Sequence, residues 1–355
     1  MHFLLDEKET KKLVSLFAQH EKNIDYMLYL RDTIWQNNGV SPSLFKEKNA
    51  FEKRSLFVDE LLKNKPTDSE FIKKSIRWDT NLIDIREYLH NPYYQALQNI
   101  SFSSNGWSLE YKTMKAFSLF PHEEEYQYGD NMTLKMNLGF FDTDYIYPTI
   151  SVEEQEWMSL NPFEIRTMET PILIAKGKVL TLGLGLGYFA YMAHLKEEVK
   201  EVHIVEMDVD LIKAFNEYLL PLFPHREKIH IHKADAFYFI ESIKDRDYDF
   251  IFADLWHDVS DGLPMYLKLK EKLNKFTFTK RMYWIESSIV TYLRTLIIGI
   301  LKDEYYKQEN KYDSLQLMLK NKLENYEIRD GHDIDALFCV QGLNKLLFEW
   351  HTPTT

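Results

Sequence analysis

The sequence has a single cysteine, Cys339, among its 355 residues. One thiol cannot form a disulfide within the chain, which is typical of proteins that fold in a reducing compartment. Long apolar runs are also missing: "LIIGIL" at 296–301 is far shorter than the roughly 20 residues that cross a bilayer. The start, "MHFLLDEKETKKL", has a very short apolar run followed at once by acids, unlike a signal peptide. We therefore expect a cytoplasmic protein without a membrane partner.

Basic residues are scarce relative to acids. The chain has 43 lysines and arginines against 55 aspartates and glutamates, a formal net charge of −12. Phosphate binding needs a basic surface, so this balance argues against a nucleic-acid partner. Internal repeats and low-complexity segments are absent from the sequence, and apolar residues make up 45% of it. The composition therefore predicts a globular protein with a packed core.

The first third of the chain predicts helices. Apolar residues recur at three- and four-residue steps through 10–35, and the pattern returns in "FEKRSLFVDELLKNKP", which stops at Pro66. These helices carry no evident chemistry. We interpret 1–120 as a helical N-terminal domain with a packing role, and homo-oligomerisation through its helices is the alternative.

Residues 121–170 predict a β-hairpin region that leads into the next domain. The turn signal "YGDN" at 128–131 and the alternating stretch 134–150 indicate short strands. The segment "SVEEQEWMSL" at 151–160 begins with a serine and has acids in its first turn. It is therefore expected to form an N-capped helix.

Strand and helix patterns alternate from 171 to 290. Strands are expected in "KVLTLGLG", "EVHIVEMD", "KIHIHKADAF", "YDFIFADLW" and "RMYWIESSIV", with helical segments between them. This order predicts an α/β fold with a doubly wound, Rossmann-like parallel sheet, because right-handed crossovers place helices on both faces. Residues 291–355 predict a C-terminal helical extension, in which a further strand at "DALFCV" is left open.

Three of the 12 glycines stand at every second position in "KVLTLGLGLG", at 178–187. In a sheet of this kind ligands bind beyond the carboxyl ends of the strands, so the turn after the first strand passes close to the ligand. Glycine permits both the tight turn and the close approach, and the free amides of the next helix face the same space. Gly183, Gly185 and Gly187 are therefore candidate ligand-binding residues.

Acidic residues follow the later strands. Glu206 ends the second strand, 23 residues after Gly183 (206 − 183), where a carboxylate can accept two hydrogen bonds from a ribose diol. Asp235 follows the third strand and could accept a hydrogen bond from an adenine amine. Asp254 ends the fourth strand, and Glu286 would join the group if the fifth strand runs through it. This pattern predicts a crevice for a nucleoside-bearing ligand.

The spacing of the glycines separates two kinds of ligand. Nicotinamide-binding turns favour G-x-G-x-x-G, but Tyr188 takes the place of the third glycine here, which disfavours a pyrophosphate. The stretch from about 160 to 290 instead resembles class I S-adenosylmethionine-dependent methyltransferases. Four motifs carry the resemblance: "VLTLGLGLGYFAYMA", "VHIVEMDVDLI", "HKADAFYFI" and "YDFIFADLWHD". The second is most similar to the spermidine synthase-like branch, and "NPFEIRTMETPILIAKGK" resembles the lead-in helix of the guanidinoacetate methyltransferase-like branch.

The resemblance implies S-adenosylmethionine as the cofactor and roles for the matching residues. It implies that Glu206 holds the ribose hydroxyls, that Asp235 and Ala236 meet the adenine, and that Asp254 faces the sulfonium. The cofactor-binding set that it implies is Gly183, Gly185, Gly187, Glu206, Met207, Asp235, Ala236, Asp254 and Glu169.

Methyl transfer to an amine requires alignment of the nucleophile and removal of a proton. Asp254 could orient the amine, and His257 is a candidate general base because the ordinary pKa of histidine is about 6.5. Asp258 completes the candidate catalytic set. No metal is expected: His230 and His232 share one face of a strand, but that strand is expected at the edge of the sheet, where polar residues are ordinary.

The sequence favours a methyltransferase that acts on a small molecule bearing an amine or a carboxylate. Aminopropyl transfer from the decarboxylated cofactor is the runner-up. Spermidine synthases have two aspartates three apart after the fourth strand, whereas Asp254 and Asp258 are four apart. A third alternative is a non-catalytic, cofactor-binding interaction protein whose helical first third contacts a partner.

Overall fold

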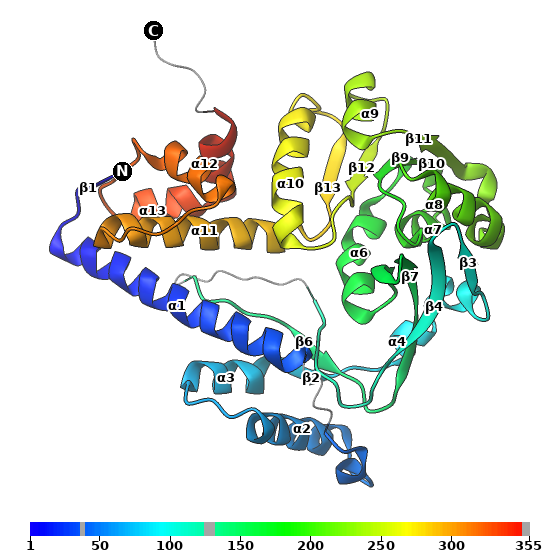
Figure 1. Ribbon diagram of the computed structural model, residues 1–355, viewed down its shortest axis with the longest axis horizontal. Coiled ribbons are helices and arrows are strands. Elements are labelled where there is room, and N and C mark those ends of the chain that lie inside the picture. Colours follow the sequence, from blue (N-terminus) through cyan, green and yellow to red (C-terminus); the bar gives the residue numbers. More distant parts are fainter. Residues whose placement is uncertain (36–39, 124–131, 350–355) are drawn as a thin grey trace.

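A five-stranded parallel sheet organises the C-terminal half of the chain (Figure 1). The structure is a computed structural model that describes residues 1–35, 40–123 and 132–349, so the expected turn at 128–131 lies outside the described residues. The strand order is β11-β10-β9-β12-β13, and every neighbouring pair is parallel, as expected. The strands are β9 (Gly177–Leu182), β10 (Val199–Glu206), β11 (Ile229–Lys233), β12 (Phe250–Ala253) and β13 (Lys280–Tyr283).

The connections make the sheet doubly wound. From β9 the chain moves outward to β10 and β11, then returns to the other side of β9 for β12 and β13. Right-handed crossovers in opposite directions place the connecting helices on opposite faces. These helices are α7 (Tyr188–His194), α8 (Val209–Ala214) with the π-helical turn η2 (Phe215–Leu219), the short turns η3 (Leu220–Leu222) and η4 (Arg226–Lys228), α9 (Ala236–Ser242) and α10 (Val259–Leu273).

The fifth strand is shorter than expected. It ends at Tyr283, and the chain turns at Ile285, which has a left-handed φ of 46°. The helix α11 (Glu286–Tyr306) begins at once, so the second half of "RMYWIESSIV" is helical rather than extended. The strand left open at "DALFCV" is also absent. Most of that segment belongs to α13 (Gly331–Phe338), whose first turn is capped by the Asp330 side chain.

An antiparallel sheet precedes the parallel one, in the order β3-β4-β7-β8. Its strands are β3 (Phe102–Ser104), β4 (Trp107–Met114), β7 (Tyr145–Val152) and β8 (Gln155–Ser159), and the helix α6 (Pro162–Ile174) follows. The expected helix at 151–160 is therefore wrong, because this segment is a hairpin. Val152 pairs with Gln155 across the two-residue turn Glu153–Glu154, whose φ angles are both positive at 49° and 68°. Such turns usually contain asparagine or glycine, so two glutamates gave no hairpin signal.

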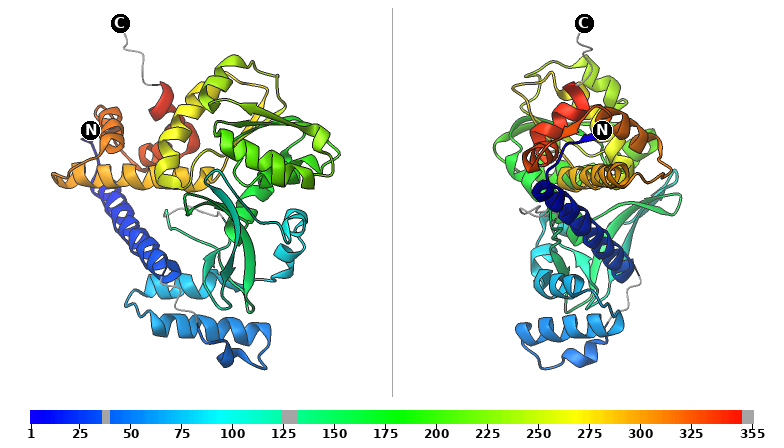
Figure 2. Two further views of the ribbon diagram at one scale, coloured as in Figure 1. Left: turned by 45° about the vertical axis from the view of Figure 1, so that its right-hand side comes forward. Right: turned by 90° about the vertical axis from the view of Figure 1, so that its left-hand side faces the viewer.

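A second, smaller core lies away from the parallel sheet, at the bottom of both views in Figure 2. It contains Phe57, Ile76, Phe117 and Phe140, and the Phe57 ring stacks on Phe140 with centroids 4.1 Å apart. The elements around it are η1 (Pro42–Phe45), α2 (Ala50–Asn64), α3 (Glu70–Asp79) and the three-stranded sheet β2 (Thr80–Leu82), β6 (Leu138–Phe140) and β5 (Phe120–Pro121). The helices α4 (Arg86–Leu89) and α5 (Pro92–Leu97) follow β2.

The long helix α1 (Glu7–Trp35) joins the two cores. Leu13 and Phe17 in its first half belong to the main core, whereas Tyr26 and Leu30 belong to the smaller one. The N-terminal strand β1 (His2–Phe3) pairs in parallel with β14 (Glu327–Ile328), so the two end segments pack side by side. The C-terminal segment also contains α12 (Ser314–Leu323), α14 (Val340–Asn344) and η5 (Lys345–Glu349). Residues 1–120 thus include strands as well as helices, and they share the main core with 291–355.

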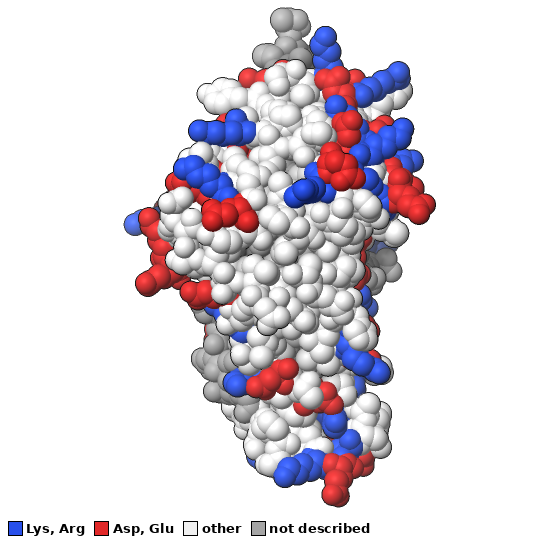
Figure 3. All heavy atoms as spheres, turned by 90° about the vertical axis from the view of Figure 1, so that its right-hand side faces the viewer, with Lys and Arg blue, Asp and Glu red and all other residues white. Residues whose placement is uncertain are grey.

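The charged side chains are unevenly distributed over the surface. On the face in Figure 3, acidic and basic side chains intermingle at the two ends, and a broad uncharged area lies between them. Among the described residues, no helix combines the length and the apolar character that crossing a bilayer requires.

Candidate functional site

A crevice of about 660 Å³ opens beyond the carboxyl ends of β9, β10, β11 and β12. This volume is typical of pockets that take a small molecule. The floor comes from the parallel sheet, while Trp107 on β4, Trp157 on β8 and Phe163 on α6 line it from the opposite side. The crevice therefore lies where the strand order reverses, at the point where doubly wound sheets bind their ligands.

Two of the three expected glycines line this crevice, and each also lies against another part of the protein. Gly183 has a φ of 98°, and a Cβ there would lie 1.9 Å from the backbone carbonyl oxygen of Asp254. Gly185 has a φ of 50°, and its Cβ would lie 2.6 Å from the Met158 sulfur. The turn is therefore bare for two reasons: the ends of β9 and β12 nearly touch, and the β7–β8 hairpin packs on the turn.

Glu206 connects the glycine turn to the start of α8. Its Oε2 accepts a hydrogen bond from the backbone N–H of Leu184, at 3.2 Å, between two of the glycines. Its Oε1 accepts hydrogen bonds from the backbone N–H groups of Met207 and Asp208, at 2.7 and 2.8 Å. Burial raises the pKa of Glu206 above its ordinary value, although these three hydrogen bonds act in the opposite direction. The sequence expected Glu206 beside the glycine turn, and the structure places it there.

Asp235 and Ala236 lie at the β11 end of the crevice. The Asp235 Oδ1 accepts hydrogen bonds from the backbone N–H groups of Phe237 and Tyr238, at 2.8 and 3.1 Å, and so caps α9. Met207 also lines the crevice and is largely exposed to solvent. The expected adenine side of the crevice is therefore built from one helix cap and its neighbours.

Two partly buried carboxyl groups, those of Asp254 and Glu164, also line the crevice. Burial raises the pKa of Asp254 to about 7. Burial and the nearby Asp254 raise the pKa of Glu164, on the first turn of α6, well above its ordinary value. Glu164 accepts a hydrogen bond from the Ser159 N–H at 3.3 Å. Sequence reasoning missed Glu164 because the pattern Asn161-Pro-x-Glu indicates a helix cap, and nothing in it shows that the acid faces a ligand space.

The crevice is acidic and aromatic. Among the crevice-lining residues that the structure describes, none is lysine or arginine. The acids are Glu156, Glu164, Glu206, Asp208, Asp235 and Asp254. The aromatic side chains are Trp107, Trp157, Phe163, Phe237, Trp256 and Trp284. A cleft lined by charges of one sign concentrates ions of the other sign, and aromatic faces attract cations. This lining favours a cationic ligand and disfavours a pyrophosphate.

The remaining expected residues on this side of the sheet have different positions. His257 lines the mouth of the crevice and is exposed, and its ring lies 6.5 Å from that of Trp157. Asp258 caps α10 by accepting hydrogen bonds from Ser260 and Asp261, and it does not line the crevice. Gly187 opens α7 in a left-handed conformation, where a Cβ would lie 2.7 Å from the Phe215 ring. The geometry thus gives Asp258 and Gly187 structural roles.

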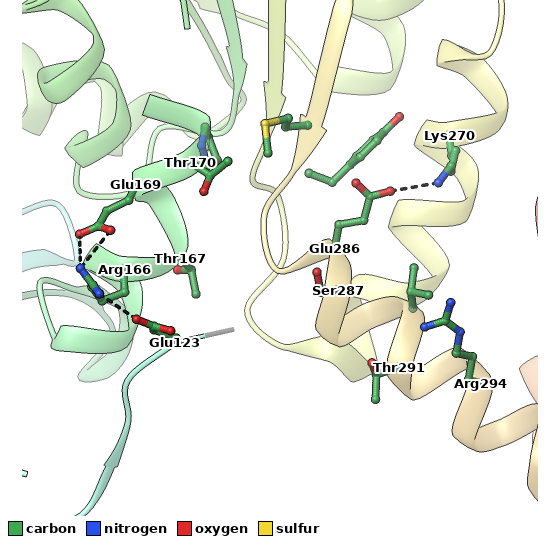
Figure 4. A pocket seen from close by; sticks show the side chains of 14 residues that line it. Glu123, Arg166, Thr167, Glu169, Thr170, Lys270, Glu286, Ser287, Thr291 and Arg294 are labelled. Atoms are coloured by element: carbon green, nitrogen blue, oxygen red, sulfur yellow. Dashed lines mark hydrogen bonds and ion pairs between the residues drawn. The ribbon is translucent and has the colours of Figure 1, made fainter. Parts of the chain in front are cut away.

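Glu169 lines a second pocket, of about 680 Å³, rather than the glycine crevice (Figure 4). Its carboxylate forms an ion pair with Arg166, one turn earlier on α6, at 2.9 Å. Arg166 also pairs with Glu123 at 2.8 Å. The lead-in helix thus turns Glu169 away from the glycine turn, contrary to the expected position beside the cofactor.

Glu286 lies across the same second pocket (Figure 4). Its Oε1 accepts hydrogen bonds from the Tyr266 hydroxyl at 2.6 Å and from the Lys270 amine at 3.0 Å. It does not reach the crevice, because the chain has already turned into α11 at this position. The two pockets meet where the Trp284 indole N–H donates a hydrogen bond to the Thr167 hydroxyl at 2.9 Å.

No protein-family model and no curated protein matches this chain. Solved structures with a partial likeness include spermidine synthase from Thermotoga maritima, with 13% identity, a TM-score of 0.31, and coverage of 43% of this chain and 58% of that one. A Klebsiella pneumoniae protein assigned as an O-methyltransferase shows 19% identity, a TM-score of 0.25, and coverage of 32% and 51%. A Corynebacterium glutamicum protein assigned as a probable spermidine synthase shows 16% identity, a TM-score of 0.28, and coverage of 44% and 52%. The match thus spans little more than half the length of these proteins, and TM-scores this low do not establish a shared activity.

Proposed function

We propose that this chain is a transferase that binds S-adenosylmethionine in the acidic crevice and transfers its methyl group to a small amine. The observation that supports this most is the lining, with six acids, six aromatic side chains and no lysine or arginine among its described residues. The sulfonium of the cofactor and an amine acceptor are both cations. A crevice of this kind stabilises both of them.

The residues of the crevice fit the cofactor. Glu206 has one carboxylate oxygen at the glycine turn and the other at the start of α8, and from there it would hold the ribose hydroxyls. Asp235 and Ala236 would lie beside the adenine, and the backbone of Gly183 and Gly185 would face the methionine part. When bound, S-adenosylmethionine supplies a methyl carbon that is activated by the sulfonium. The fit is chemical, because acceptor oxygens of the protein would meet the hydroxyl and amine donors of the ligand.

Asp254 and Glu164 would act on the acceptor. An amine must lose a proton to become a nucleophile, and a carboxylate with a pKa of about 7 can take that proton near neutral pH. The negative charge of Asp254 disfavours a charged Glu164, so a bound cation between them would favour the charged forms of both. We assign Asp254 the role of orienting and deprotonating the amine. Glu164 stabilises the positive charge of the amine.

Aminopropyl transfer is the second candidate, and one observation favours it. S-adenosylmethionine has a carboxylate, and the described lining has no lysine or arginine to pair with it. The decarboxylated cofactor lacks this group and has only positive charge. An acidic crevice is better suited to that ligand and to a polyamine acceptor.

Calorimetry with both cofactors tests the proposal. We expect S-adenosylmethionine to bind one site per chain, and Glu206→Ala to weaken binding at least tenfold. Glu197→Ala, which removes an exposed acid before β10, is the matched control and should bind like the unmodified protein. Tighter binding of the decarboxylated cofactor would decide for aminopropyl transfer.

Absence of heat with either cofactor would overturn both enzyme proposals. Equal affinity of the Glu206→Ala variant would overturn the assignment of the crevice, even if the chain binds the cofactor elsewhere. Far-UV circular dichroism of each variant checks that lost binding is not lost folding.

A further inference from the structure

Four metal-ligating side chains gather at the edge of the parallel sheet, away from the crevice. Glu201 and His203 lie two residues apart on β10, and His230 and His232 lie two residues apart on β11. His203 and His230 are direct neighbours in the parallel register, so all four side chains share one face. The sequence alone showed only the pair on β11, because the pairing of β10 with β11 supplies the other two.

The distances between these groups are short. The His203 Nε2 lies 3.0 Å from the Glu201 carboxylate, and its Nδ1 lies 2.7 Å from the His232 Nε2. One ligand atom each from Glu201, His203 and His230 lie within 4.8 Å of one another. Two ligand atoms that each lie about 2.0–2.2 Å from one zinc ion are at most about 4.4 Å apart, so the three groups need to approach one another only slightly. Small side-chain rotations would therefore bring all three onto one ion.

We propose that Glu201, His203 and His230 bind a divalent transition-metal ion, most suitably zinc, and that His232 orients His203 from behind. Two imidazoles and one carboxylate form a set that zinc accepts, with water in the fourth position. A ligating histidine usually donates its second ring N–H to a neighbouring acceptor, which fixes the tautomer. The His232 Nε2 faces the His203 Nδ1 in this way. The metal joins the edge strand β11 to β10.

The exposure of the three ligands suits metal binding. His203 is buried between the two strands. His230 is exposed, and Glu201 is partly so, which leaves an entry path from solvent. The site combines one buried ligand with two that an ion can reach.

Lys178 competes with the metal for Glu201. Its Nζ lies 3.6 Å from the Glu201 Oε2 and also over the Tyr248 ring, 5.2 Å from its centroid. A divalent ion must displace this ammonium group from the carboxylate. Removal of the lysine charge is therefore expected to strengthen metal binding. Removal of a ligand is expected to weaken it, so the two kinds of variant should change the metal affinity in opposite directions.

The metal site and the crevice are separable. Glu201 and Glu206 lie five positions apart on β10 (206 − 201), which is roughly 16 Å along a strand. Failure of metal binding therefore leaves the proposed transferase untouched, and failure of cofactor binding leaves the metal site untouched.

The test uses the full chain after treatment with a chelator. Zn²⁺ is titrated in competition with a chromophoric chelator, and Co²⁺ serves as a spectroscopic probe of coordination. We expect one equivalent of metal, a Co²⁺ spectrum typical of a four-coordinate site, and a higher Tm with zinc. His230→Asn and Glu201→Gln should each abolish stoichiometric binding, His232→Asn should weaken it 10–100-fold, and Lys178→Met should strengthen it.

The control is His225→Asn, which removes the histidine of another exposed pair, where the His225 Nδ1 lies 3.6 Å from Glu227. This variant should bind zinc like the unmodified chain. Because His230 is exposed, its variant should fold, so lost binding there reports the site itself. Less than one equivalent of zinc in the unmodified chain, or unchanged affinity in His230→Asn, would overturn the proposal.

Discussion

Asp254 shows how a single residue makes the crevice responsive to pH. Its folded-state pKa of about 7 is higher than the ordinary aspartate value near 3.9. Between about pH 4 and pH 7 the folded state therefore binds more protons than the unfolded state, so this group's contribution to stability falls as the pH rises and is level above pH 7.

We expect Asp254→Asn to remove this contribution. Between pH 5 and pH 8, the free energy of unfolding of the variant should fall by roughly 2–4 kcal/mol less than that of the unmodified protein. Glu164 keeps a slope of the same sign, because burial raises its pKa too. Denaturant unfolding at a series of pH values measures the effect. An identical slope in both proteins would mean that Asp254 is not the titrating group.

Substitutions at Gly183 and Gly185 distinguish the effect of a clash with backbone from that of a clash with a side chain. Both have positive φ, which costs an L-residue about 1–2 kcal/mol. At Gly183 the added Cβ meets the carbonyl oxygen of Asp254 in a neighbouring strand end, which cannot move freely. At Gly185 it meets the flexible Met158 side chain. We expect Gly183→Ala to destabilise more than Gly185→Ala in urea unfolding, and the reverse order would contradict this account.

At the scale of elements, the β7–β8 hairpin is held in a conformation that its turn residues do not prefer. Glu153 and Glu154 both adopt positive φ. Replacing them with Asn-Gly, which favours this turn, should raise stability by about 1 kcal/mol. A thermal melt measures the gain. Glu110→Gly in the extended strand β4 is the control, and it should lower the Tm because glycine weakens a strand interior.

At the scale of the whole molecule, two cores are joined by α1. Phe57 is almost fully buried in the smaller core, so Phe57→Ala should cost about 3–5 kcal/mol there. Cofactor affinity should remain within twofold, because Phe57 lies outside the crevice. The exposed Phe51 on the same helix is the matched control. Calorimetric melting with and without cofactor distinguishes the two cores. A large loss of affinity would indicate that they are strongly coupled.

Local patterns sufficed where the required conformation depended on neighbouring residues. The alternation of strands and helices from 171 to 290 predicted the parallel sheet, and its central strands β9, β10 and β12 are largely buried. The same holds for Gly183 and Glu206, since a bend after the first strand and an acid after the second meet in any sheet with this order. The two wrong predictions, a helix at 151–160 and a strand beyond 283, also have a local origin. Nothing in "SVEEQE" marks a left-handed turn, and nothing near Ile285 marks the switch from strand to helix.

The sequence by itself determined the parallel sheet, the edge where a ligand would bind and the acids that follow its strands, because strand period and chain order impose these. Only the tertiary structure decided which acids face one space. Packing of the β7–β8 hairpin and α6 over the sheet brought Glu164 beside Asp254, turned Glu169 into another pocket and used Asp258 as a helix cap. These outcomes depend on contacts between segments far apart in the chain, which no local pattern contains.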